Sequence, residues 1–322
     1  MTKHSLVQSR RSGRVLTLTL NNPPMNFLTS PMMEELNDTL KALEQDREIG
    51  AVILTSGVEG IFLTHFDVDE IEQAAEAVPF AVSTDQASLL TRTAKAISAM
   101  PNGRRLIRST PMAGVADMNL YHEVTARMRR LDKVLIAAIN GRAMGGGCEL
   151  ALACDLRIMV AGSEQDGVMI GQPEILLGLI PGGGGTQFLT RSLGVAKALE
   201  HCLEGRPLSP QQALELGMVN QVVQADQLMD AANSLAERMA RRSPQAVAAI
   251  KHAVYQSASH RFDQGMQEEK SAFLSMATQA NTRHASTQYI TRVRDMIQKG
   301  QQPTIEDFQD MIEGTAFDMT SR

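Results

Sequence analysis

The chain has few cysteines, and their placement excludes two kinds of stabilising site. Cys148, Cys154 and Cys202 are odd in number and form no C-x-x-C pair. The sequence therefore supports neither a disulfide framework nor a zinc site. We expect no metal site and a cytoplasmic location, where thiols stay reduced.

Long apolar runs and an excess of basic residues are also missing. No apolar run reaches the length of a membrane span, so we expect no contact with membranes. Residues 1–14 are basic, but they lack the apolar core of a secretory signal and are short for the alternative, an organelle transit peptide. The net charge of −5 argues against nucleic acid as the main partner.

Residues 134–160 combine a strand, a glycine turn and a helix. The apolar run at 134–139 predicts a buried strand, three glycines stand at 145–147, and residues 148–153 favour a helix. Glycines let the backbone approach a ligand, and N–H groups at a helix start attract negative charge. This unit can stabilise an oxyanion beside the carboxylate of Glu149. The alternative is an ordinary tight turn, with Glu149 complementing the helix dipole.

A second carboxylate lies within residues 170–187. Glu174 follows a proline and is surrounded by isoleucine, leucine and glycine. Because an apolar setting disfavours the charged form of a carboxyl group, Glu174 can serve as an acid or a base. The sequence therefore predicts two glutamates that flank one oxyanion site.

These two segments, NGRAMGGGCELALACDLR and GQPEILLGLIPGGGGTQFLTR, resemble the signature of the crotonase (enoyl-CoA hydratase/isomerase) superfamily. The motifs are most similar to those of enoyl-CoA hydratases, and the resemblance covers about residues 14–256. It implies an α/β fold with a crotonase-like ββα spiral core at 1–205 and a C-terminal α-helical oligomerisation region at 206–300. A tail at 301–322 follows. The resemblance also implies a homotrimer or a homohexamer built as a dimer of trimers.

The chemistry implied by the resemblance is the addition of water to a 2-enoyl-CoA thioester, or its removal, in fatty acid metabolism. CoA is then part of the substrate, and no other cofactor is expected. The N–H groups of Phe66 and Gly146 would stabilise an enolate-like oxyanion. Of Glu149 and Glu174, one would act as base and the other as acid. Hydratases of the family keep both glutamates, which favours a lyase. The alternatives are an isomerase, a dehydratase, a thioesterase or, less favoured, a non-catalytic acyl-CoA-binding protein.

Residues 61–71 depart from the family pattern. The resemblance places His65 where glycine is usual, and Phe66 where a small residue donates the first oxyanion N–H. Phe66 keeps that N–H, but its ring would reshape the acyl pocket. His65 is either a third acid or base, or a histidine held by packing and hydrogen bonds. Asp67 matches the pattern and is expected to cap the next helix.

The loop between a predicted strand at 14–20 and a predicted helix at 31–43 is expected to help bind CoA, because the family uses its equivalent for that purpose. A strand is also predicted at 51–54. An ordinary connection between a strand and a helix explains the loop equally well. The residues assigned to the CoA and acyl pocket are Met25, Phe27, Leu28, Thr64 and Asp67.

The segment at 72–133 is longer than the family normally has between its motifs, and we interpret it as a helical insertion. Two helical patterns, at about 85–100 and 115–131, flank an arginine-rich loop. The insertion is expected to form a lid or a wall of the acyl pocket. Its arginines Arg104, Arg105 and Arg108 either meet CoA phosphates or, as we favour, form a solvated face.

Helical patterns dominate the C-terminal part. Helices are predicted at 196–203, 209–216, 225–241, 243–257, 262–278 and 283–299, with a short strand at 219–223. Residues 161–168 have turn composition and predict a surface loop. The polar tail is expected to be weakly ordered or packed on a neighbour.

Overall fold

Two β-sheets form the centre of the computed structural model, which describes residues 5–77, 82–256, 271, 273, 275, 280–301 and 306–319. The larger sheet has, in order across it, β1 (Val7–Ser12), β2 (Val15–Leu20), β3 (Ala51–Ser56), β5 (Val134–Ile139), β7 (Leu156–Val160) and β9 (Gln221–Val223). The smaller sheet has β4 (Gly60–Leu63), β6 (Gly141–Met144) and β8 (Ile170–Gly171). Neighbouring strands are parallel except β1 and β2.

The strands predicted at 14–20, 51–54 and 134–139 are confirmed. Every residue of β5 is buried, as a parallel strand covered on both faces requires. Residues 7–12, within the basic N-terminal segment, form β1 at the edge of the larger sheet. Exposed Arg10 and Arg11 suit this position, because charged side chains discourage pairing with a further strand.

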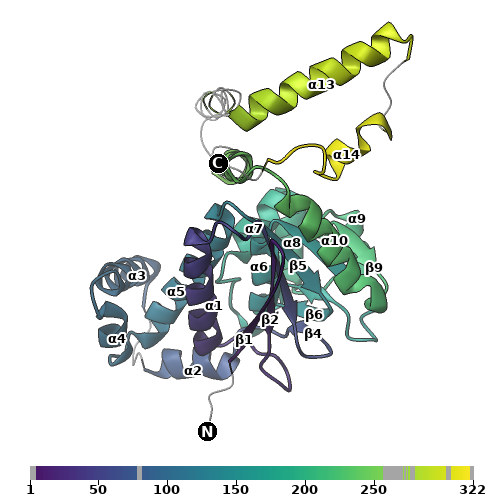
Figure 1. Cartoon of the computed structure of the whole chain (residues 1–322). Helices are drawn as coiled ribbons and strands as arrows, with labels where there is room; N and C mark the ends of the chain where they lie inside the picture. The colour runs from purple at the N-terminus through teal and green to yellow at the C-terminus, as the bar shows by residue number, and fades with distance from the viewer. Residues whose placement is uncertain are drawn as a thin grey trace.

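Helices cover the larger sheet on both sides, and Figure 1 shows α1 (Ser30–Gln45) and α5 (Ala113–Arg130) on one side and α10 (Leu228–Ala240) on the other. The helix predicted at 31–43 is confirmed as α1. It begins where the Thr29 side chain accepts the Met32 N–H, and its apolar stripe is buried. The remaining helices before residue 230 are α2 (Val68–Glu76), α3 (Thr84–Ser98), α4 (Gly103–Arg108), α6 (Gly146–Ala153), α7 (Gly185–Leu193), α8 (Val195–Glu204) and α9 (Pro210–Glu215).

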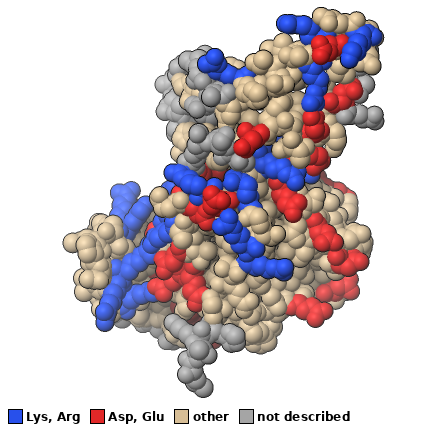
Figure 2. Space-filling model, viewed as in Figure 1, with Lys and Arg blue, Asp and Glu red and all other residues tan. Residues whose placement is uncertain are grey.

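The insertion contains α3 and α5 as predicted, but the arginine-rich stretch between them is not only a loop. It forms the short helix α4, whose side chains bind neighbouring helices. Arg108 pairs with Asp117 of α5 and with Glu34 of α1, and Arg104 pairs with Glu123. Figure 2 shows Lys and Arg side chains along this side of the molecule with Asp and Glu side chains against them. These ion pairs favour the solvated face over binding of CoA phosphates.

The C-terminal predictions are largely confirmed. Residues 195–223 form α8, α9 and β9, and the stretch at 225–241 forms the 3-10 turn η2 (Ala225–Gln227) followed by α10. The later helices are α11 (Pro244–Tyr255), α13 (Ala280–Gln298) and α14 (Gln309–Ile312), the last preceded by η4 (Glu306–Phe308). The helix predicted at 262–278 lies outside the described residues except for 271, 273 and 275. Within the described ranges, no helix has the length and apolar character needed to cross a membrane.

The described part of the tail, 306–319, packs on its own chain. Arg241 Nη1 donates to Glu313 O, and Arg242 Nη1 donates to Met311 O, both at 2.9 Å. The helical turns η4 and α14 were not predicted, because short polar segments have no helical period to detect. Figure 1 shows α13 and α14 at the end of the molecule away from the N-terminus.

A buried ion pair attaches α11 to the sheet. Lys251 Nζ lies 2.8 Å from Asp155 Oδ2 and donates to the carbonyl oxygens of Met128 and Lys133 at 3.1 and 2.9 Å. Tyr255 Oη donates to Asp155 Oδ1 at 2.8 Å. Burial lowers the pKa of Lys251, and Asp155 opposes this shift.

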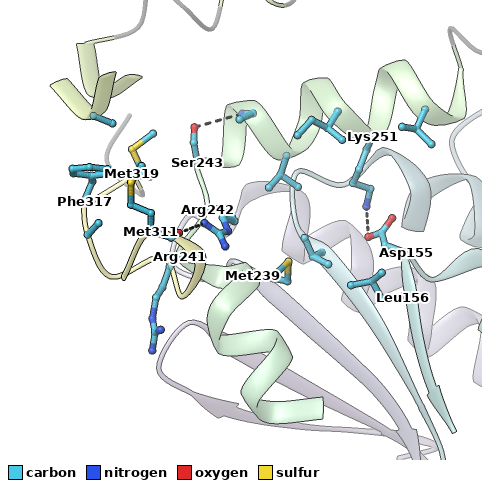
Figure 3. Close-up of a pocket in the computed structure, with 18 of the residues that line it drawn as sticks. Asp155, Leu156, Met239, Arg241, Arg242, Ser243, Lys251, Met311, Phe317 and Met319 are labelled. Carbon is cyan, nitrogen blue, oxygen red and sulfur yellow. Dashed lines mark hydrogen bonds and ion pairs between the residues drawn. The ribbon is translucent and has the colours of Figure 1, made fainter. Parts of the chain in front are cut away.

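A cavity of about 590 Å³ lies beside this pair, between α11 and the tail (Figure 3). Figure 3 shows Lys251 directed at Asp155 on one side, and Met311, Phe317 and Met319 on the other. Its walls are mostly apolar. The glutamates singled out by the sequence do not line it, so the candidate active site lies elsewhere.

Replacing Lys251 by methionine should destabilise the fold strongly. The variant keeps most of the side-chain volume but leaves Asp155 buried without its cation, and breaking such a pair costs about 3 kcal/mol or more. Urea unfolding measures the change in the free energy of unfolding. Lys197→Met is the matched control, because the pair of Lys197 with Glu200 is exposed and should contribute less than about 1 kcal/mol. Equal effects of the two substitutions would contradict this account.

Candidate active site

The glycine turn at 145–147 lies where three chain segments meet. The sequence predicted a turn directly between strand and helix, but the short strand β6 intervenes and pairs with β4 and β8. Gly145 has φ +49° and donates to Gly171 O at 2.8 Å. A Cβ added at Gly147 would lie 2.4 Å from Leu63 O. Only glycine permits this approach, and α6 begins directly after Gly145.

The two residues whose N–H groups are predicted to bind an oxyanion are neighbours in space. A Cβ added at Gly146 would be 3.2 Å from Phe66 N. Leu28 N–H donates to His65 O and Asp67 N–H donates to Leu28 O, both at 2.9 Å, which leaves the Phe66 N–H on the other side of this loop. Within residues 5–77 and 82–256, neither N–H has a protein acceptor. Their binding of a thioester oxygen stays a prediction.

His65 adopts an ordinary backbone conformation although it replaces the usual glycine. Among the described residues other than glycine, only Asn26 and Asn102 have positive φ. His65 Nδ1 lies 2.7 Å from Phe66 O, which can only accept, so Nδ1 carries a proton. The His65 ring also lies 5.0 Å from the ring of Phe27. These contacts agree with a packed histidine, and a catalytic role stays untested.

The loop at 24–28 is held by a residue to which the sequence assigned no role. Asn26 is fully buried, and its Nδ2 donates to Ser56 Oγ at 2.9 Å and to Phe62 O at 2.6 Å. Leu28 and Thr64 are also buried, and the Thr64 hydroxyl donates to Met25 O. These contacts build the loop.

Two further contacts bear on the CoA and acyl pocket. Asp67 Oδ1 accepts the Asp69 N–H at 3.0 Å, as expected of a residue that caps a helix. Phe27 lies partly buried with its ring against His65. The assignment of Met25, Phe27, Leu28, Thr64 and Asp67 to the pocket remains a prediction, which their placement in two hydrogen-bonded loops supports.

Glu149 lies on α6 with its carboxylate buried beneath the turn before α7. It is 3% exposed, and Oε1 accepts the N–H groups of Gly183 and Gly185 at 2.7 and 2.8 Å. Burial raises the pKa of Glu149, while hydrogen bonds from the Gly185 and Gly183 N–H groups and the nearby Tyr121 hydroxyl oppose the shift. These donors stabilise the charged carboxylate in an apolar place.

Glu174 begins the 3-10 helix η1 (Glu174–Leu177) and is partly exposed. A Cβ added at Gly145 would lie 3.1 Å from Glu174 Oε1, so this carboxylate borders the glycine turn. Burial raises the pKa of Glu174 to about 7, its own backbone N–H opposes the shift, and the charge of Glu149 adds to it. The two predicted glutamates therefore meet at one site with different environments.

Sequence reasoning missed two side chains at this site. Gln172 is fully buried. In the amide orientation that gives both its oxygen and its nitrogen a partner, Nε2 donates to the two Glu174 carboxylate oxygens at 2.9 and 3.1 Å. A polar residue in an otherwise apolar run two positions before Glu174 was the available signal. Tyr121 of α5 donates to Gly146 O at 2.6 Å, and no local pattern marked it.

Metal-binding groups are not assembled in the part of the chain that the structure describes. Those residues contain no cluster of three or more His, Cys, Asp or Glu side chains arranged for a metal ion. Cys148 and Cys154 are buried, and burial raises the pKa of both thiols. The described polar groups at the site include carboxylates, amide N–H groups, a tyrosine hydroxyl and the His65 imidazole.

Known proteins resemble this chain over most of its length. The family model described as “Enoyl-CoA hydratase/isomerase” matches residues 10–120 and 108–298. A Dictyostelium discoideum protein named “Probable enoyl-CoA hydratase, mitochondrial” is 34% identical over 266 residues, or 82% of this chain and 80% of that protein. The “Short-chain-enoyl-CoA hydratase” of Clostridium acetobutylicum is 30% identical over 283 residues, or 88% and 93% of the two chains.

A solved structure also shares the fold. The enoyl-CoA hydratase from Bacillus anthracis superimposes with a TM-score of 0.67 and 26% identity, and the match covers 93% of this chain and 98% of that one. This likeness confirms the predicted fold class. The two matches of the family model overlap at residues 108–120, which lie inside the region interpreted as an insertion.

Replacing Glu174 by glutamine should stabilise the protein above neutral pH. The pKa of Glu174 is about 7 in the folded chain, against a usual 4.5. Between these pH values the folded chain therefore binds more protons than the unfolded chain. The free energy of unfolding falls as the pH rises through this range. Glu174→Gln removes this loss, so the free energy of unfolding of the variant should exceed that of the wild type by about 2 kcal/mol at about pH 8. This figure is reduced to allow for the partial exposure of Glu174.

Urea unfolding at about pH 5 and about pH 8 measures this effect. The exposed Glu59 offers the control Glu59→Gln, which should leave the pH dependence unchanged. A Glu174→Gln variant that gains no stability between the two pH values would contradict the raised pKa.

Proposed function

The chain belongs to the enoyl-CoA hydratase/isomerase family, and from this membership we propose that it hydrates a 2-enoyl-CoA thioester. One observation carries the proposal: the Glu174 carboxylate borders the glycine turn that lies against Phe66 N, and it is close enough to Glu149 to be affected by its charge. The relatives named as enoyl-CoA hydratases support it. CoA is part of the substrate, and the scheme needs no cofactor or metal.

The oxyanion site comes first in the mechanism. The thioester carbonyl oxygen accepts the N–H groups of Phe66 and Gly146, which stabilise the negative charge that grows on this oxygen when water adds. Both groups belong to backbone that glycine packing and the Leu28 hydrogen bonds hold in place. Little reorganisation is therefore needed as the charge develops.

The two glutamates then divide the proton transfers. Glu149, whose charged form two backbone N–H groups stabilise, accepts a proton from the water as its oxygen bonds to C3. Glu174, whose pKa is raised to about 7, donates a proton to C2. The product carries hydroxyl on C3 and hydrogen on C2, and proton exchange between the carboxyl groups restores the starting state.

A different reaction of the same family is the second candidate. Phe66 and His65 stand where the family pattern has small residues, and the insertion borders Phe66 through Tyr121. An isomerase, dehydratase or thioesterase would be preferred if crotonyl-CoA were not hydrated while a longer or branched thioester reacted. We also propose a cytoplasmic location from the cysteine pattern, although one relative is named mitochondrial.

Replacement of either glutamate by glutamine should abolish most of the hydration. Loss of a general acid or base costs about 100-fold to 10,000-fold in kcat. The loss of absorbance of 2-enoyl-CoA substrates of several chain lengths measures the activity of the wild type, Glu149→Gln and Glu174→Gln. Glu164→Gln, in the surface loop at 161–168, is the control and should retain full activity. A folded wild type that binds CoA but hydrates no substrate would contradict the proposal.

We propose further that the chain forms homo-oligomers through the region at 206–300, as the resemblance implies, and through an apolar surface on η1 and α8. Val195, Leu199 and Leu203 follow one another at four-residue intervals on α8 and are more than half exposed. Leu176 of η1 packs beside Gly205 at the end of this helix, which makes the surface continuous. Large exposed apolar patches usually mark interfaces. The full set is Leu176, Leu177, Ile180, Val195, Leu199 and Leu203.

Charged substitutions on this surface should break the assembly. The double variant Leu199→Glu and Leu203→Glu places two carboxylates on it and should shift the molar mass in light scattering from a trimer or hexamer toward the monomer. Gln211→Glu, an exposed substitution on α9, is the control. A wild type that is monomeric, or an assembly that both variants retain, would contradict the assignment.

A further inference from the structure

Tyr121 reaches the centre of the site from the insertion helix α5. It is 4% exposed, and its hydroxyl donates to Gly146 O at 2.6 Å. Its ring meets the ring of Phe66 edge to face, with centroids 6.3 Å apart and an interplanar angle of 85°. One side chain of the insertion thus contacts both residues that would supply the oxyanion N–H groups.

The same helix contacts the turn that binds Glu149. A Cβ added at Gly183 would lie 1.7 Å from Tyr121 Cε1 and 2.4 Å from Glu149 Oε2, so the ring and the carboxylate meet at this glycine. The next residue of the helix, His122, has Nε2 2.7 Å from Gly182 O. Because the Gly183 N–H donates to Glu149, any displacement of α5 would alter that hydrogen bond.

We propose that Tyr121 is a positioning residue for the hydration reaction. Its hydroxyl holds the glycine turn at Gly146, and its ring holds the Gly183 turn against Glu149, so the insertion helix sets the distance between oxyanion site and base. This proposal rests on the proposed function and deepens it. The insertion then acts on the chemistry itself, in addition to forming a wall around the acyl chain.

The titration of Glu149 offers a readout of this role. The titratable side chains that face Glu149 are Tyr121 from α5, Cys148 from α6, Glu174 from η1 and Cys202 from α8. Burial raises the pKa of the tyrosine and of both thiols, so they stay protonated near neutral pH. The nearby Tyr121 hydroxyl lowers the pKa of Glu149, and removal of this hydroxyl should raise that pKa.

The variant Tyr121→Phe tests the proposal, because it keeps the ring and removes only the hydroxyl. With crotonyl-CoA as substrate, kcat should fall about tenfold, the effect of one lost hydrogen bond of about 1.4 kcal/mol. KM should change by less than about twofold, since the ring still fills its place. The acid limb of the kcat profile should move to higher pH, because Glu149 must be ionised to act as base.

Tyr255→Phe is the matched control, since Tyr255 is a tyrosine of α11 that donates to Asp155 outside the site. It should lower the thermal midpoint but leave kcat and the acid limb unchanged. An equal loss of kcat in both variants would overturn the proposal. So would a Tyr121→Phe enzyme with the wild-type kcat and pH profile.

Infrared titration of the carboxyl groups separates this proposal from the proposed function. Subtraction of the Glu149→Gln spectrum identifies the Glu149 band, and its midpoint should rise in Tyr121→Phe whether or not the protein turns over crotonyl-CoA. A wild type without hydratase activity would reject the proposed function, and the infrared midpoint alone would then decide the role of Tyr121. An unchanged midpoint would overturn that role.

Discussion

The burial of one carboxylate constrains much of this molecule. Glu149 lies on the first turn of α6, where water cannot solvate it, so the turn before α7 must present N–H groups to it. That turn can approach only because Gly183 has no side chain, since Tyr121 and the carboxylate fill the space around it. A helix of the insertion, the glycine turn and α7 are thus fitted around a single charge.

The second carboxylate, that of Glu174, lies in the same fold as Glu149 but has different hydrogen-bond partners. Glu174 lies at the start of a short 3-10 helix, where the described residues offer it the side-chain amide of Gln172 and its own backbone N–H. Burial and the nearby charge of Glu149 then act with less opposition, and its pKa reaches about 7. This contrast in hydrogen bonding, and not in residue type, would separate the proposed acid from the proposed base.

Periodic features of this fold could be predicted from the sequence, and single contacts could not. The strand at 134–139, the glycines at 145–147 and the apolar face of α1 follow from local rules of period and turn chemistry. The glutamates were found because charged residues beside glycine or within apolar runs are unusual. Tyr121 escaped notice because its contacts are distant in sequence, and α4 and α14 because they are too short to show a helical period.

The 3-10 helix η1 contains both the titrating carboxyl group of Glu174 and part of an exposed apolar surface. Glu174 begins it, and exposed Leu176 and Leu177 complete the same turn. Any surface that covers these leucines removes water from the neighbourhood of the acid and strengthens its hold on the proton. Linkage requires the converse: protonation of Glu174 favours the state in which these leucines are covered. Covering the leucines and binding the proton are thus coupled by a single free energy. In the proposed homo-oligomer, proton affinity at this site would therefore depend on the quaternary structure as well as on the chain.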